Sequence, residues 1–158
     1  MVPRRITSAD LVQVTGFSRH RLRSLMKDLP GYSIRGSAER IAREYTRHDL
    51  MVIAVCCELE NRCGLRRDAI AKLVPEIRRA MIGPRSVSDE ARLVVVPDLV
   101  SVQYIDGPSS VLQGTVLPLE GIFRRVDQYL LGDQLDADDQ RNLDLGPMAI
   151  PAGRRSNA

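Results

Sequence analysis

Residues 6–45 read ITSADLVQVTGFSRHRLRSLMKDLPGYSIRGSAERIAREY, and this stretch predicts a helix, a tight turn and a second helix. The first helix is expected over residues 8–14. Gly16 suits the turn because glycine adopts a positive φ without steric strain. Ser18 is a favourable N-cap, so the second helix is expected over residues 18–27.

The second helix has an apolar side and a cationic side. Leu22, Leu25 and Met26 form the apolar side, which we expect to pack against the first helix. A short helix of this kind, placed after a glycine turn, is typical of a DNA recognition helix. The alternative is an exposed basic helix without a partner, because cationic helix faces are common. The cationic residues of this helix are Arg19, His20, Arg21, Arg23 and Lys27.

A short hairpin is expected directly after this helix. Residues 32–34 and 41–45 have the pattern of two strands around a loop at residues 35–40. A hairpin beside a recognition helix forms a wing, whose arginines meet phosphate or the minor groove. A plain solvated hairpin is the alternative. The wing would contribute Arg35, Arg40 and Arg43, and Tyr45 would support it.

Nearly half of the chain, from residue 6 to residue 73, resembles the N-terminal domain of the MerR family of transcription regulators. The resemblance rests on four groups of residues in a given order and spacing, and it implies a winged helix-turn-helix fold that binds double-stranded DNA. The four groups are residues 6–14 as the opening helix; Thr15, Gly16, Phe17 and Ser18 followed by Leu22 and Arg23; Arg43, Glu44 and Tyr45 with Asp49 and Leu50; and Gly64 and Leu65 followed by Ile70 and Leu73.

The sequence departs from the family pattern in three places. Ser24 and Leu25 stand where the family often has an aromatic pair, and residues 28–31 lack its usual glycine-leucine pairing. The contacts of those family residues are therefore not transferred to this chain. Many MerR proteins also continue into a long dimerisation helix, which Gly83 and Pro84 forbid here.

Two further helices are expected after the wing. The first covers residues 46–62, with Thr46 as its cap and Asp49 three residues later, which is a variant of the capping box. The second covers residues 66–81. Pro75 should kink or restart this second helix, because proline removes one backbone hydrogen bond.

The second half of the chain changes to a β-like pattern. Residues 93–96, 100–105 and 111–117 are predicted strands, and a turn at residues 106–110 would join the last two into a hairpin. A helix with an apolar stripe is expected over residues 119–131. Because a lone hairpin is marginal in water, it needs this helix or the hairpin of a second chain as its partner.

These patterns predict a mainly α fold with a small β part, in the α+β class. We expect a DNA-binding domain over residues 1–82 and a flexible tail over residues 132–158. Between them, residues 83–131 would form a dimerisation module made of the β-hairpin and the helix.

Charge is divided unevenly along the chain, although the net charge is only +3. Residues 1–82 hold 16 lysines and arginines against 9 aspartates and glutamates, a balance of +7. Residues 83–158 hold 7 against 11, a balance of −4. The basic half is the half with the predicted recognition helix, which favours nucleic-acid binding there.

The remaining reactive residues form no catalytic or metal-binding pattern. Cys56, Cys57 and Cys63 have no histidine near them in sequence, so we expect small buried side chains rather than a disulfide or metal site. No cofactor is predicted, and an enzyme is the least favoured class. The sequence has no run of ~18 apolar residues and no signal-peptide pattern, so it predicts a cytoplasmic setting without membrane contact.

We therefore expect a sequence-specific transcription regulator that binds double-stranded DNA as a homodimer. Arg19, His20 and Arg23 are expected at base edges. Arg21 and Lys27 are expected at phosphates, together with the wing arginines. One alternative is an architectural or excisionase-like protein that bends DNA, and another is a protein–protein adaptor with the same fold.

Overall fold

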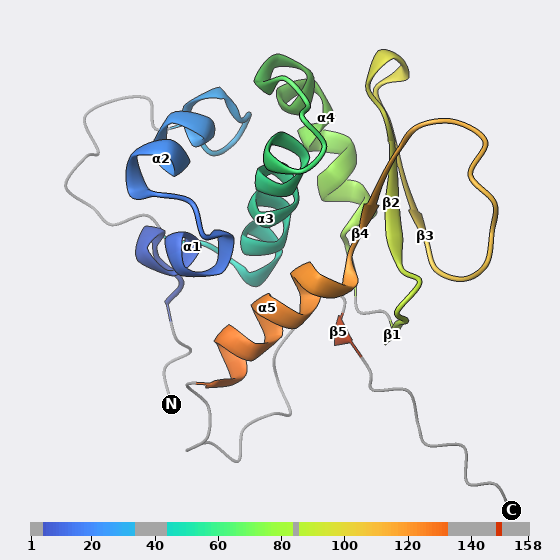
Figure 1. Ribbon diagram of the computed structural model, residues 1–158. Coiled ribbons are helices and arrows are strands. Elements are labelled where there is room, and N and C mark those ends of the chain that lie inside the picture. The colour runs from blue at the N-terminus through green and yellow to red at the C-terminus, as the bar shows by residue number, and fades with distance from the viewer. Residues whose placement is uncertain (1–4, 34–43, 84–85, 133–147, 150–158) are drawn as a thin grey trace, which may run out of the picture.

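The computed structural model describes residues 5–33, 44–83, 86–132 and 148–149, and within these ranges the fold is α+β (Figure 1). Among the described residues no helix is both long and apolar enough to cross a membrane. The helices are α1 (Ser8–Thr15), α2 (Arg19–Asp28), α3 (Arg47–Asn61), α4 (Arg67–Ala80) and α5 (Glu120–Gly132). A three-stranded sheet contains β2 (Arg92–Val96), β3 (Ser101–Ile105) and β4 (Thr115–Pro118), and β1 (Ser86–Val87) pairs in parallel with β5 (Met148–Ala149).

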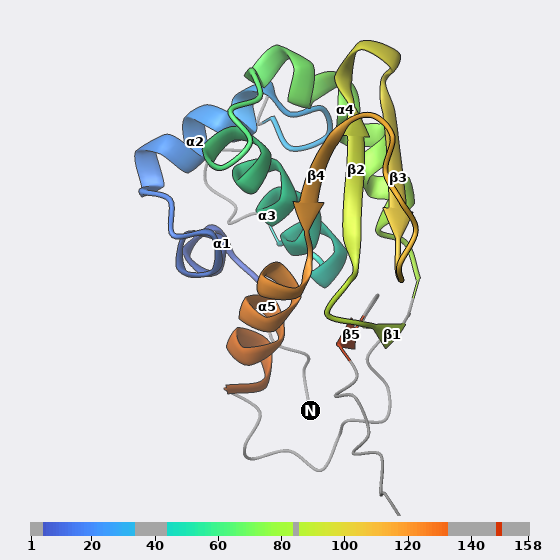
Figure 2. The same ribbon diagram turned by 45° about the vertical axis from the view of Figure 1, so that its right-hand side comes forward.

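Helix α3 is the central element of the fold. Every residue from 50 to 59 is buried, so α3 is covered on all sides. Helices α1, α4 and α5 pack around it, with the sheet beside α4 (Figures 1 and 2). The predicted capping box starts the helix: the Thr46 hydroxyl accepts the Asp49 N–H at 3.1 Å, and the Asp49 carboxylate accepts the Thr46 N–H at 2.9 Å.

Helix α4 continues through Pro75, so of the two outcomes predicted for this proline, a kink or a restart, the restart is wrong. A proline inside a helix costs about 3 kcal/mol, because one backbone hydrogen bond is lost. Each large apolar side chain that becomes buried contributes about 1.5–3 kcal/mol, so the packing of α4 outweighs that cost. Pro75 itself is exposed, and the buried side chains are Ile70, Leu73, Val74 and Ile77.

The sheet has the strand order β3-β2-β4, with β2 in the centre and both neighbours antiparallel to it. Leu93 therefore pairs with Tyr104 on one side and with Leu117 on the other. This corrects the predicted hairpin of residues 100–105 with residues 111–117. The chain after β3 does not turn back beside that strand but crosses to the opposite edge of β2 (Figure 2).

The connection from β3 to β4 is held close to β2. The Arg92 guanidinium donates to the carbonyl oxygens of Gly107, at 2.8 Å, and of Ser109. Gly114 has a φ of 121°, and a Cβ at this position would lie 3.0 Å from Val94 Cγ1. An arginine of β2 thus contacts the beginning of the connection, and a residue without a side chain lies against β2 at its end.

The inner face of the sheet and helix α5 belong to the same buried cluster as α1, α3 and α4. The cluster is therefore continuous past residue 83, where the sequence pattern predicts the end of a domain. Of the tail expected at residues 132–158, only β5 and the end of α5 lie within the described residues. The side chains that the sheet and α5 add to the cluster include Leu93, Val95, Leu117, Ile122, Phe123 and Val126.

Polar contacts also join α5 to the N-terminal helices. Arg47, at the start of α3, pairs with Asp127, and Arg125 donates to the Glu58 carboxylate at 2.6 Å. The Tyr129 hydroxyl donates to Asp10, a residue of α1. Helix α5 is thus attached to α1 and α3 by hydrogen bonds as well as by apolar packing.

Candidate nucleic-acid interface

Short-range hydrogen bonds fix the turn between α1 and α2. Gly16 has a φ of 70°, and its N–H donates to the Val12 carbonyl at 3.0 Å. The Thr15 hydroxyl donates to the Leu11 carbonyl at 2.7 Å and accepts the Phe17 N–H at 3.3 Å. The glycine turn predicted from the sequence is therefore confirmed, and it sets the direction in which α2 leaves α1.

Helix α2 buries one side and exposes a cationic one. The Ser18 hydroxyl caps the helix by accepting the Arg21 N–H at 3.2 Å. Leu22, Leu25 and Met26 are buried, as the sequence predicts. At about 100° per residue, four exposed basic residues fall within an arc of about 100°. These four residues form the cationic face of α2: Arg19, His20, Arg23 and Lys27.

Arg21 points away from the cationic face, although the sequence places it with the phosphate-binding residues. Its guanidinium lies 3.9 Å from the centre of the Phe17 ring, in a cation–π contact. It also donates to the Asn61 side chain at 3.4 Å and pairs with the Glu60 carboxylate at 3.5 Å. The structure therefore directs Arg21 toward α3 and gives it internal partners.

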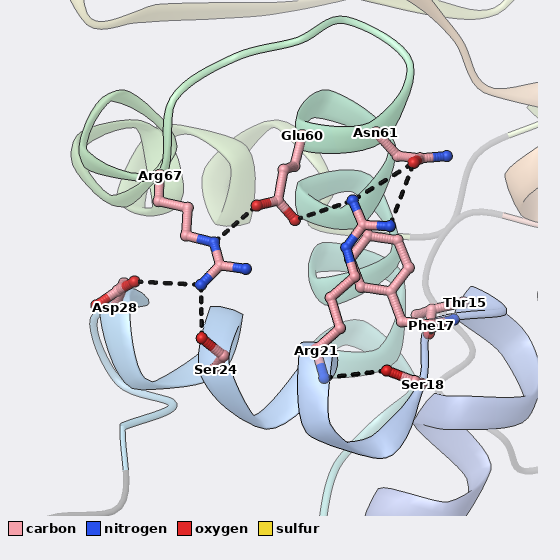
Figure 3. A network of polar contacts seen from close by, with 9 residues as sticks. All are labelled: Thr15, Phe17, Ser18, Arg21, Ser24, Asp28, Glu60, Asn61 and Arg67. Carbon is pink, nitrogen blue, oxygen red and sulfur yellow. Dashed lines mark hydrogen bonds and ion pairs between the residues drawn. The ribbon is translucent and has the colours of Figure 1, made fainter.

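Glu60 lies between two arginines that come from different helices (Figure 3). One of its oxygens faces Arg21, and the other accepts Arg67 Nε at 2.7 Å. Arg67 Nη1 donates to the Ser24 hydroxyl at 2.7 Å and lies 3.8 Å from the Asp28 carboxylate. Helix α2 is thereby connected to both α3 and α4 on a side that faces away from its cationic face.

Sequence reasoning missed Glu60 and Arg67. A detectable signal is a carboxylate within a helix whose other residues are mostly apolar, because such a group needs a charged partner. That signal identifies Glu60 as a paired residue. It does not identify the partners, because Arg21 is distant in sequence and Arg67 belongs to the next helix, so the three residues become neighbours only in the folded chain.

The chain directly after α2 is also anchored. Tyr32 lies in a turn and is buried, which corrects the prediction that a strand begins there. Its hydroxyl donates to Asp49 at 3.0 Å, and the Arg78 guanidinium lies 4.9 Å from the centre of its ring. Burial raises the pKa of Tyr32, and the neighbouring Asp49 charge raises it further.

Asp49 has a lowered pKa because its hydrogen bonds outweigh its burial. Burial on its own would raise the pKa of this carboxyl group. The Thr46 N–H, the Tyr32 hydroxyl, the Thr46 hydroxyl and the positive charge of Arg78 all favour the ionised form. An ionised Asp49 therefore connects the start of α3 to the turn that follows α2.

The far end of the predicted wing meets the start of the chain. Tyr45 is buried and pairs with Ile6 in an isolated antiparallel bridge, with the Tyr45 N–H donating to the Ile6 carbonyl at 2.9 Å. Arg5 and Glu44 form an ion pair of 3.0 Å beside this bridge. The wing arginines of the sequence prediction, Arg35, Arg40 and Arg43, lie outside the described residues.

The cysteines are packed as the sequence predicts. Cys56 and Cys57 are buried within α3, and Cys63 is partly buried. Burial raises the pKa of the Cys56 thiol to about 12, which keeps it protonated at neutral pH. Within the described ranges, no group of three or more His, Cys, Asp or Glu side chains is placed to hold a metal ion.

No protein-family model, curated protein or solved structure matches this chain.

Proposed function

We propose that this protein is a sequence-specific DNA-binding transcription regulator that acts as a homodimer. The observation that carries the proposal is the cationic face of α2, which is exposed while another side of the helix is held by α3 and α4. A helix that is packed against its neighbours and carries outward arginines after a glycine turn has the form required to enter the DNA major groove.

Within this proposal the residues of α2 have distinct roles. Arg19, His20 and Arg23 contact base edges, and an arginine can donate two hydrogen bonds to O6 and N7 of one guanine. Lys27 contacts a phosphate and positions the helix without reading sequence. Ser18 supports the interface by capping α2.

The winged helix-turn-helix interpretation is part of the same proposal. It is supported by the resemblance to MerR regulators and by the anchoring of Tyr32 and Tyr45 on both sides of residues 34–43. In this interpretation Arg35, Arg40 and Arg43 contact the DNA backbone beside the groove that α2 occupies.

The proposed homodimer rests on the small contact area that a single recognition helix makes with DNA. One recognition helix reads only a few base pairs, so regulators of this kind reach useful specificity by placing two helices about 34–36 Å apart. The site is then expected to be a palindrome with half-sites about one helical turn apart.

Selection of binding sites from a pool of random duplexes tests the proposal. We expect an enriched palindrome, and the affinity for it should fall with salt at a log–log slope of about −0.9 per phosphate contact. Clustered direct repeats would instead favour an architectural or excisionase-like protein. No enrichment and no salt dependence would refute DNA binding and favour a protein–protein adaptor.

A further inference from the structure

Glu60 makes contacts that link α2 to both neighbouring helices. Its side chain is only 17% exposed, and it pairs with Arg67 at 2.7 Å and with Arg21 at 3.5 Å. Arg67 extends the connection to Ser24, at 2.7 Å, and to Asp28, at 3.8 Å. We call these five residues the α2 clamp.

The clamp contacts α2 at several positions along the helix axis. Arg21 and Asp28 are seven residues apart, which is about two helical turns. At about 100° per residue, Arg21, Ser24 and Asp28 lie within about 60° of one another. The centre of the cationic face lies about 120° away from this group on the helix surface. Contacts spread in this way resist rotation of α2 as well as its displacement.

Rotation of α2 would impair any contact that depends on geometry. A rotation of about 20° moves a side-chain tip about 6 Å from the helix axis by about 2 Å. Two parallel hydrogen bonds to one guanine require donor–acceptor distances near 2.7–3.2 Å, so they do not survive such a movement. Phosphate contacts tolerate it, because long basic side chains adjust to a charged surface.

We propose that Glu60 is a positioning residue that sets the rotation of α2 and thereby the base discrimination of the cationic face. This inference rests on the proposed function. Glu60 also offsets one of the two positive charges of Arg21 and Arg67, so its loss makes this part of the protein more positive and strengthens sequence-independent attraction to DNA. Loss of the clamp therefore lowers the affinity for the preferred site relative to other sequences. The sequence-independent affinity for DNA stays the same or rises.

The test uses the full chain with three substitutions. Glu60→Gln removes the charge at nearly the same size, and Glu60→Asp keeps the charge but shortens the side chain. Glu120→Gln is the matched control, because Glu120 also forms an ion pair with an arginine, Arg124 of α5, but belongs to another part of the fold. For each variant, the binding affinity is measured for the duplex that the wild type enriches and for a scrambled duplex of the same composition.

We expect Glu60→Gln to lower the ratio of specific to scrambled affinity at least about fivefold, the size of one lost base contact. Binding to the scrambled duplex should become stronger and more salt-dependent, by about 0.9 in slope per added phosphate contact. Glu60→Asp should lower the ratio without strengthening non-specific binding. Glu120→Gln should keep the wild-type ratio.

Amide hydrogen exchange without DNA provides a separate measurement of the clamp. In Glu60→Gln the amides of α2 should exchange faster while those of α3 keep their protection. If Glu60→Gln does not fold, Ser24→Ala removes one clamp contact and should lower the ratio to a smaller extent. Unchanged ratios in the folded Glu60 variants, with the wild type still selecting a site, would overturn this inference alone. A wild type that enriches no duplex would overturn the proposed function instead, whatever α2 exchange shows.

Discussion

Two arginines two positions apart on α2 have opposite environments. Arg23 is exposed on the cationic face, whereas Arg21 stacks on Phe17 and pairs with Glu60. In an α-helix, residues two apart point about 200° from each other, so the two arginines cannot lie on the same face of α2. Their roles are therefore set by position on the helix and not by residue type.

Substitution of these two arginines should separate stability from DNA binding. Arg21→Ala is expected to lower the free energy of unfolding by about 0.5–2 kcal/mol, because it removes the cation–π contact and the Glu60 pair. Arg23→Ala should change it by less than about 0.5 kcal/mol, yet cost about 1–3 kcal/mol in binding to the preferred site. Urea unfolding and titration with the selected duplex measure both quantities. Equal losses of stability would show that the environment assigned to Arg21 is wrong.

The lowered pKa of Asp49 gives the protein a predictable response to acid. A carboxyl group whose pKa is lower in the folded state than in the unfolded state stabilises the fold at pH values above its usual pKa of 3.8. That stabilisation is lost as the pH falls through the folded-state pKa. We therefore expect the stability difference between the wild type and Asp49→Asn to be larger near about pH 6 than near about pH 3. Tyr32→Phe removes one hydrogen bond to Asp49 and should reduce this pH dependence, as unfolding curves at both pH values would show.

At the scale of elements, local signals in the sequence predicted the helices well. The Thr46 and Asp49 capping box, Gly16 and the apolar side of α2 all act within a few residues of one another. The order of the sheet strands could not be predicted in this way. Residues 100–105 and 111–117 each have a strand pattern, but their common partner is β2, and the loop that joins them contacts Arg92, which is distant in sequence from β4.

Two glycines in the β3–β4 connection provide a matched test of the crossing. Gly107 and Gly114 have φ values of 116° and 121°, so alanine is strained at both positions. An added Cβ meets open space at Gly107 but approaches Val94 and the Val95 carbonyl at 3.0 Å at Gly114. We expect Gly114→Ala to be more destabilising than Gly107→Ala by about 1–3 kcal/mol, which is the usual cost of overpacking. Equal effects in thermal unfolding would mean that the connection does not lie against β2.

At the scale of the whole molecule, the charge differs between the two halves of the chain, but the buried core is shared by both. The basic half of the chain ends near residue 82, and the helix pattern ends there as well. The buried cluster nevertheless continues into the sheet and α5, because Leu93 and Phe123 pack against residues of the first half. Sequence patterns locate where a helix stops, but not which distant residues share a core.

Removal of everything after residue 82 tests whether the N-terminal half can fold alone. The cut would remove fully buried side chains from the core, including Leu93, Val95 and Phe123. Each such side chain contributes about 1.5–3 kcal/mol, so three of them approach the total stability of a typical domain, about 5–15 kcal/mol.

The same cut would leave two charged residues that are at most 8% exposed in the whole protein, Arg47 and Glu58, without Asp127 and Arg125. We therefore expect residues 1–82 to unfold without a sharp thermal transition, or to aggregate, whereas residues 1–132 should unfold cooperatively like the full chain. Circular dichroism melting curves and light scattering on both fragments would measure this. A monomeric 1–82 fragment with a cooperative transition would show that the N-terminal half is an independent domain, and that α5 and the sheet are attached to a core that is already complete.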